Sequence, residues 1–204
     1  MICDIPFIPE PPTKGVPEMT TTAEQTIPGY VVGTWTIDPT HSEIGFSVRH
    51  MMVSKVRGKF TSFSGEIVTG ESLLDSSVTA TIDLGSIDTG NPDRDKHIRA
   101  ADFLQVDQYR TMSFRSTAVR RDGDHYALDG ELTLKAVTRP ITLRLDLGGF
   151  ATDPRAGTRA GATAVGRLNR RDFGVDFSTI LEAGVVVVGD QVDLQLEIEA
   201  KLNS

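Results

Sequence analysis

The stretch VDLQLEIEAK (residues 192–201) alternates strictly between apolar and polar side chains. Val192 to Ala200 supply the apolar even-numbered positions, and Asp193 to Lys201 supply the charged or polar odd-numbered ones. Successive side chains of a β-strand point to opposite faces, so this pattern is typical of a strand with one dry face and one wet face. It is the clearest secondary-structure signal in the chain and indicates an all-β protein.

The same alternation recurs along the chain from Trp35 onward. It is seen in EIGFSVRH (43–50), VTATIDL (78–84), TMSFRS (111–116), HYALDGELTL (125–134), ITLRLDL (141–147) and RAGATAVGRL (159–168). A further strand is expected in GKFTSFSGEIV (58–68), and turn signals stand at Asp122-Gly123, Gly148-Gly149 and Gly189-Asp190. About eight strands joined in this way predict a single antiparallel β-barrel of the lipocalin-like kind.

Two segments do not alternate. NPDRDKHIRAADFL (91–104) has a proline near its start and clustered apolar residues, which predicts one short helix across a barrel end. Residues 1–33 are rich in proline, threonine and glutamate, a composition typical of an irregular tail or linker. We therefore expect a barrel domain over residues 34–204 behind a tail whose role is open, with Met19 as an alternative start.

Charge and composition exclude several classes of partner. The formal net charge of −7 argues against nucleic acid, which binds concentrated Lys and Arg. The single cysteine, Cys3, cannot form an internal disulfide. No apolar run is long enough to span a bilayer and no signal peptide is visible, so we expect a cytoplasmic protein with at most transient membrane contact.

One strand carries unusually small side chains on its expected inner face. Ala160, Ala162, Ala164 and Gly166 occupy four successive positions where a packed core normally holds larger residues. Either an internal cavity lies beside this strand, or large neighbours such as Phe60 lean across the gap. The residues alone leave both readings open.

Four blocks of the sequence, in order, resemble the YceI-like family of lipocalin-like, polyisoprenoid-binding proteins. They are IDPTHSEIGFSVRHMMVSKVRGKFTSFSGEI (37–67), TIDLGSIDTGNPDRDKHIRAADFLQVDQY (81–109), GELTLKAVTRPITL (130–143) and GRLNRRDFGV (166–175). The resemblance runs from about Trp35 to Leu202. Arg110 and Ala136 depart from it, since proline and glycine are expected there.

The resemblance implies an eight-stranded barrel that holds the tail of an isoprenoid lipid or isoprenoid quinone, often in a homodimer. The implied function is transport or storage of that amphiphilic ligand, with no enzymatic activity and no required cofactor. Strand parity and the family's tunnel together predict the apolar lining, which comprises Phe46, Val48, His50, Met52, Phe60, Met112, Phe114, Leu132, Leu143, Ala162 and Ala164.

Polar side chains near a barrel mouth are candidates for contact with the ligand's headgroup. His50 shares the parity of the lining and could donate to a quinone carbonyl, although a strand-end histidine bonded to backbone or water explains it as well. Arg94, Arg99 and Arg171 are the natural partners of a phosphate. In the simpler reading, Arg94 pairs with Asp93 or Asp95, and one of these acids caps the helix.

Two other functions stay open from sequence. Asp95 and His97 would serve a lipid-acting hydrolase or isomerase if they met in a pocket. However, no G-x-S-x-G nucleophile motif is present. The four histidines also lack metal-ligand spacing, so no metal site is expected. The second alternative is a barrel with a filled core that serves as a protein-interaction module.

Overall fold

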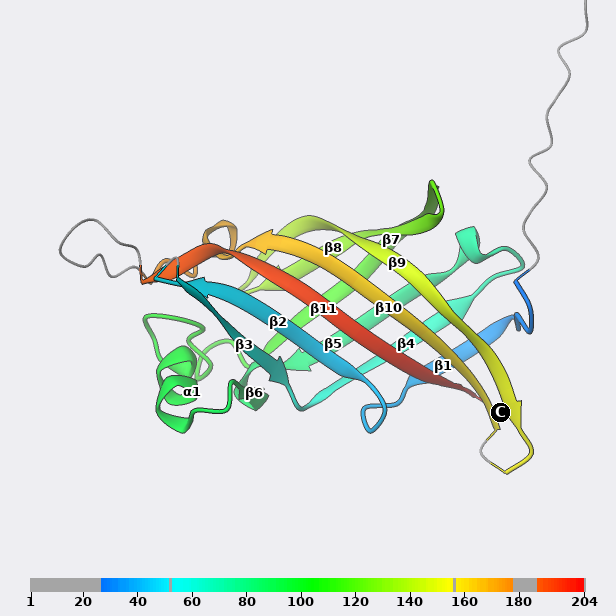
Figure 1. Cartoon of the computed structure of the whole chain (residues 1–204), viewed down its shortest axis with the longest axis horizontal. Coiled ribbons are helices and arrows are strands. Elements are labelled where there is room, and N and C mark those ends of the chain that lie inside the picture. Colours follow the sequence, from blue (N-terminus) through cyan, green and yellow to red (C-terminus); the bar gives the residue numbers. More distant parts are fainter. Residues whose placement is uncertain (1–26, 52, 156, 178–186, 204) are drawn as a thin grey trace, which may run out of the picture.

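The computed structural model describes residues 27–51, 53–155, 157–177 and 187–203. Within this part the chain is built almost entirely from strands, with one α-helix at one end of the molecule (Figure 1). The elements are β1 (Gly33–Ile37), β2 (Glu43–His50), β3 (Ser54–Phe60), β4 (Phe63–Thr69), η1 (Leu73–Asp75), β5 (Ser77–Asp83), η2 (Leu84–Ser86), β6 (Ile87–Asp88), α1 (Pro92–Arg99), β7 (Thr111–Asp122), β8 (His125–Leu134), β9 (Val137–Asp153), β10 (Gly157–Asn169), η3 (Arg170–Phe173) and β11 (Val188–Leu202).

The sheet closes on itself through β11. One edge of β11 pairs with β10, and the other pairs first with β1 and then with β2, which lie end to end. β3 with β4, and β5 with β6, are likewise two halves of one broken strand, because the halves pair with successive parts of the same neighbours. The eleven segments therefore make eight antiparallel barrel strands, and the predicted all-β barrel is confirmed.

Two of the three predicted turns are wrong. Asp122-Gly123 does form the β7–β8 turn, where Gly123 takes φ +62°. Gly148-Gly149 instead lies inside β9, and Gly189-Asp190 lies inside β11, each at a shift in the strand register. Bulges let a long strand bend while it stays paired, and glycine suits them because it tolerates unusual φ angles.

Trp35 closes the barrel end that lies opposite the helix. Its side chain is fully buried, and its Nε1 donates to Thr69 Oγ1 at 2.9 Å. The Phe150 ring packs edge-on against it at 5.6 Å between centroids, and Tyr30 packs edge-on against Phe150 at 5.3 Å. Tyr30 belongs to the described part of the expected tail, whereas residues 1–26 lie outside the described residues.

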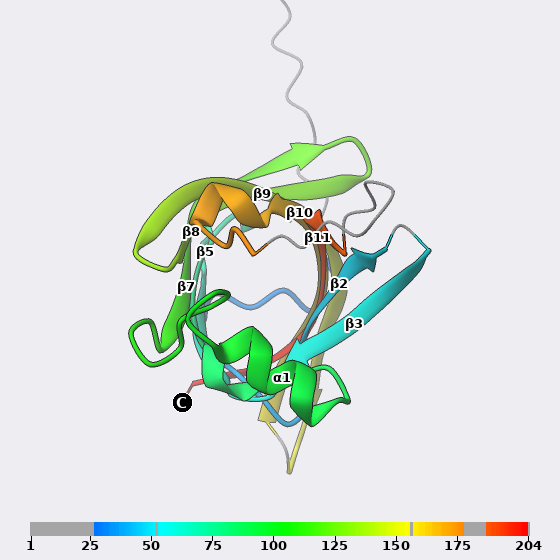
Figure 2. The same cartoon turned by 90° about the vertical axis from the view of Figure 1, so that its left-hand side faces the viewer.

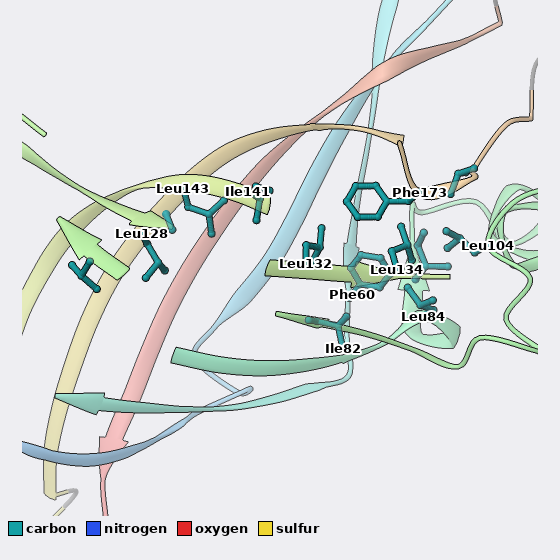
Figure 3. Packing of buried hydrophobic residues seen from close by; sticks show 14 of the residues in the cluster. Phe60, Ile82, Leu84, Leu104, Leu128, Leu132, Leu134, Ile141, Leu143 and Phe173 are labelled. Atoms are coloured by element: carbon teal, nitrogen blue, oxygen red, sulfur yellow. The ribbon is translucent and has the colours of Figure 1, made fainter. Parts of the chain in front are cut away.

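The predicted short helix is α1, and it lies across the other end of the barrel (Figure 2). Its N-cap is Asn91, whose side chain accepts from the Arg94 backbone N–H at 3.0 Å, so the expectation of an aspartate cap is wrong. Beneath it, apolar side chains of β3, β5, β8, η2 and η3 pack together (Figure 3). Leu84 in this group is fully buried.

Hydrogen bonds and ion pairs hold the break between β1 and β2 against β11. The Asp38 N–H donates to the Glu199 carbonyl at 2.8 Å, and the Glu199 N–H donates to Ser42 Oγ at 2.9 Å. Arg159 of β10 donates to the carboxylates of Asp38 at 2.6 Å and Glu199 at 2.8 Å. Arg159 and His41 together hold the pKa of Asp38 well below its ordinary value of 3.8.

Replacing Thr69 by Val should destabilise the fold by about 1–3 kcal/mol, because the buried indole N–H loses its acceptor. Trp35→Ala should cost about 3–5 kcal/mol through the cavity that it creates. Denaturant unfolding measures both values, and Thr79→Val on the exposed face of β5 is the matched control. If T69V costs as much in a Trp35→Phe background as in the wild type, the indole hydrogen bond is not the source of the effect.

Arg159→Met should lower the Tm at neutral pH and lower it less in acid. The depressed pKa of Asp38 means that its ionised form stabilises the folded state above pH 4, and this contribution is lost as the pH falls. Thermal unfolding at pH 7, 5 and 3 follows the difference. Arg167→Met, which removes a more exposed ion pair from the same strand, should change Tm little at any pH. Equal Tm losses by R159M at all three pH values would contradict this account.

Candidate ligand cavity

The barrel encloses an apolar cavity of about 140 Å³. All eight barrel strands contribute to its lining, and every lining residue is either apolar or a glycine. The alternation of each strand explains this composition, because the apolar parity of all the strands meets at the barrel axis. An aliphatic chain fits such a lining, whereas an ionised or strongly polar group inside it would have no hydrogen-bond partner.

Glycines in the wall keep this space open. A Cβ at Gly130 would lie 2.4 Å from the Phe114 ring, and one at Gly58 would lie 2.5 Å from Phe46 Cζ. The two rings therefore lie flat against the wall over glycines of the neighbouring strands rather than crossing the lumen. Both readings left open for β10 apply in part, since Ala162 and Ala164 line the cavity whereas the Leu143 side chain lies against Gly166.

The cavity is small for the long-chain ligand that the resemblance implies. An apolar cavity of about 150 Å³ accommodates one benzene molecule, so 140 Å³ suits about one five-carbon unit. Both ends are packed, by Trp35 at one end and by the cluster beneath α1 at the other. A longer chain would have to displace lining side chains.

Most of the predicted lining surrounds this cavity. It includes Phe46, Phe60, Met112, Phe114, Leu132, Leu143, Ala162 and Ala164. Val48 and His50 lie on the same face of β2 but nearer its end, outside the cavity lining. Met52 lies outside the described residues. Their role in binding a ligand stays a prediction.

Sequence reasoning missed several lining residues that the same parity rule would have found. They are Ile37, Ile44, Phe63, Ile67, Val78, Ala80, Ile82, Leu128, Ile141, Leu145, Leu168, Leu194, Leu196 and Ile198. Most lie in stretches that visibly alternate. Ile37, Phe63 and Ile67 were harder to assign, because the breaks after β1 and β3 interrupt the alternation there.

Arg94 and Arg99 are occupied in holding α1 to the barrel. Arg94 donates to Thr89 Oγ1 at 2.7 Å and to the Thr89 carbonyl at 2.8 Å. Arg99 donates to the Ile87 carbonyl at 2.7 Å. Ser86 O, one residue before Ile87, accepts from Thr61 N–H on the β3 side. Carbonyls alternate in direction along extended chain, so those of Ile87 and Thr89 point away from β3. The arginines thus satisfy acceptors on the free edge of β6, and Arg94 does not pair with an aspartate as expected.

Arg171, the third headgroup candidate, is engaged by Asp190, with 2.8 Å between Nε and Oδ1. The neighbouring Arg170 is buried and donates to Asp190 and to the carbonyls of Gly189 and Val188. Burial lowers the pKa of Arg170, and the Asp190 carboxylate opposes that shift. This group fixes η3 to the start of β11, so a structural role accounts for both arginines.

The structure does not join Asp95 and His97 into a catalytic pair. The buried Asp95 accepts from the N–H and hydroxyl of Thr89, at 3.0 and 2.5 Å. The exposed His97 instead contacts Asp102, with 2.9 Å between Nε2 and Oδ2, and hydrogen bonding to it lowers the pKa of Asp102. Residues two apart on a helix point to different sides, which explains the separation.

Asp38, His41 and Glu199 lie close enough to one another to share a metal ion. Arg159 already lies between the two carboxylates, however, at 2.6 and 2.8 Å. Its guanidinium supplies the positive charge that a metal ion would bring, so this group is an ion-pair cluster. Among the described residues, no helix combines the length and apolar character needed to cross a membrane.

Comparisons with known proteins agree with this architecture. The YceI-like domain model matches residues 35–200. Protein YceI of Escherichia coli O157:H7 is 36% identical over 160 residues, which cover 78% of this chain and 81% of that protein. The crystal structure of the Campylobacter jejuni YceI protein has a TM-score of 0.65 at 27% identity and covers 76% of this chain and 90% of that one.

A polyisoprenoid binding domain from Saccharophagus degradans has a similar fold. Its TM-score is 0.64 at 17% identity, covering 85% of this chain and all of that one. The domain match and the Escherichia coli relative together establish the family by sequence, and the barrel agrees with it. The chain belongs to the YceI-like family.

Proposed function

We propose that this protein binds a long-chain isoprenoid lipid, a polyprenyl compound or an isoprenoid quinone, inside its barrel and transports or stores it. The observation that carries the proposal is the cavity inside the barrel, whose lining consists wholly of apolar residues and one glycine. The name of the related Saccharophagus degradans domain as polyisoprenoid binding supports the ligand class. The mechanism is burial of the chain from water, which requires no catalytic group and no cofactor.

The free energy of burial suits such a ligand. Each buried CH₂ contributes about 0.8 kcal/mol, so one five-carbon unit contributes roughly 3–4 kcal/mol before ordering costs. A few units would be enough for tight binding. Because the lining offers no hydrogen-bonding side chain, selectivity would depend on chain length and shape, with the headgroup lying outside the apolar part.

Binding a chain of several units requires the cavity to lengthen. Met112 and Phe114 line it from β7, and unbranched methionine adapts its shape at low cost. Phe114 can leave its place over Gly130 without leaving a polar group unpaired. We therefore infer that the ligand displaces these side chains as it enters. A homodimer and a cytoplasmic location, both expected from the sequence, stay predictions.

The purified protein should carry a co-purifying polyprenyl or isoprenoid quinone species at near one molecule per chain. Native mass spectrometry gives the bound mass, and organic extraction followed by lipid mass analysis identifies it. A protein that is empty after purification, and that also takes up no added isoprenoid quinone, would contradict the carrier function and favour the interaction module.

Ala164→Phe should reduce uptake of an isoprenoid quinone at least tenfold, because the new ring would fill a cavity that suits about one benzene. Overpacking should cost about 1–3 kcal/mol of stability. Binding is followed by quenching of the single tryptophan, Trp35, on addition of a quinone with a short isoprenoid tail. Thr163→Phe, on the outer face of the same strand, is the control and should bind normally. Unchanged binding by folded A164F would place the ligand elsewhere.

A further inference from the structure

The hairpin that joins β2 and β3 exposes apolar side chains at its tip. Val53 is 86% exposed and Met51 is 36% exposed. The turn is closed by the Val53 N–H donating to the His50 carbonyl at 3.1 Å, and the Met51 N–H donates to Val187 O at 2.9 Å. The hairpin lies at the same end of the barrel as α1 and projects to the side of it (Figure 2). The tip is therefore held in place with its apolar side chains in water.

Turn geometry does not account for these residues. Met51 takes φ +50°, a left-handed conformation that costs a residue with a Cβ more than glycine. The loop between the paired residues His50 and Ser54 has three residues, and three-residue hairpin loops usually place glycine at a left-handed position. The chain instead places Met51 at the left-handed position, which costs backbone conformational energy. It also leaves the apolar side chain of Val53 exposed to water directly before β3. An apolar surface that contacts the tip would supply the missing burial.

Positive charge is concentrated on the same hairpin. No aspartate or glutamate occurs between Glu43 and Glu66, whereas Arg49, Lys55, Arg57 and Lys59 all fall there, in a chain of net charge −7. Lys55 pairs with Asp193, and Lys59 pairs with Glu43. Within the described part of the chain, the exposed Arg49 and Arg57 have no ion pair.

The register of the hairpin places like charges against each other. Arg49 lies directly opposite Lys55, and Ser47 lies opposite Arg57, so the three cations share the outer face near the tip. Like charges directly opposite on neighbouring strands are destabilising. A partner with negative charge would relieve this repulsion, so an anionic surface complements the outer face just as an apolar one complements the tip.

The inner face of the hairpin leads from the tip toward the cavity. Val48 pairs with Val56 and with Val192, and all three follow the parity of the cavity residue Phe46. His50 lies four residue steps beyond Phe46, roughly 13 Å along the strand. The exposed apolar tip thus lies one short apolar strip away from the ligand cavity.

We propose that the β2–β3 hairpin docks on an anionic lipid bilayer. Met51 and Val53 enter the headgroup region, and Arg49 and Arg57 contact lipid phosphates. A lipid surface fits better than a nucleic acid, because the apolar tip has no use on a phosphate backbone, and the flanking charge suits a bilayer interface. This docking goes beyond the proposed ligand binding and does not depend on it.

The full-length protein should bind vesicles of 70% phosphatidylcholine and 30% phosphatidylglycerol, and should bind pure phosphatidylcholine vesicles far more weakly. Since each basic residue near an anionic surface contributes about fivefold in affinity, R49Q/R57Q should bind roughly 25-fold more weakly. M51S/V53S should lose at least tenfold. Cosedimentation measures the binding of the wild type to both vesicle types and of each double variant to the anionic vesicles. Adding 0.5 M salt should weaken vesicle binding by the wild type, because it screens the charges.

Matched controls come from the opposite end of the barrel. Val32→Ser removes a valine that is 56% exposed, and Arg155→Gln removes an exposed arginine from the β9–β10 turn. Both should bind vesicles like the wild type. In Val53→Trp, the tryptophan emission should shift to shorter wavelength with anionic vesicles, whereas Val32→Trp should show no shift.

Two results would overturn the docking proposal. One is that the wild type does not bind anionic vesicles, or that it binds neutral vesicles equally well. The other is a pair of hairpin double variants that bind like the wild type, which would assign binding to another face. Uptake of a short-tailed quinone, measured without vesicles, is recorded in parallel. Hairpin variants should retain that uptake, so failure of docking and failure of ligand binding are distinguished.

Discussion

Closure of the barrel depends on β11, which is paired along both edges. Its amphipathic sequence buries one face, while its backbone pairs with β10 on one side and with the broken strand β1–β2 on the other. A sheet closed in this way has no long exposed edge. The contacts at Glu199 lie where the first strand meets this last one, and the Trp35–Thr69 hydrogen bond joins β1 to β4 along its other edge. Both therefore hold β1 in the closed sheet.

The lumen combines a packed cluster with a small free space. Glycines at 58, 130 and 166 give neighbouring side chains a place against the wall, which keeps the centre of the barrel empty. At the α1 end, buried leucine and phenylalanine side chains pack against one another (Figure 3). The lumen is thus packed around an apolar space whose growth would expose no polar group, which suits the proposed binding of an apolar chain.

The polar residues at the α1 end of the barrel mainly form hydrogen bonds with backbone groups. β6 is short and has a free edge, and its outward carbonyls need donors because buried acceptors are costly when unpaired. Arg94 and Arg99 supply those donors, and Asp95 accepts from Thr89 beside them. The same cluster of charges in sequence suggests catalysis or phosphate binding. The hairpin differs, since Arg49 and Arg57 have no ion pair and Val53 stays exposed within the described part of the chain, although Lys55 and Lys59 are paired.

By itself the sequence determined the all-β class, the eight strands, the single helix and the parity that sends Phe46, Met112 and Ala164 inward, because alternation is a local property of each strand. Only the tertiary structure decided what depends on neighbours distant in sequence. In the structure three strands are each broken in two, Gly148-Gly149 forms a bulge instead of the predicted turn, and the helix cap is Asn91 instead of an aspartate. The tertiary structure also set the cavity at about 140 Å³, since free volume is what remains after side chains from eight strands have packed together.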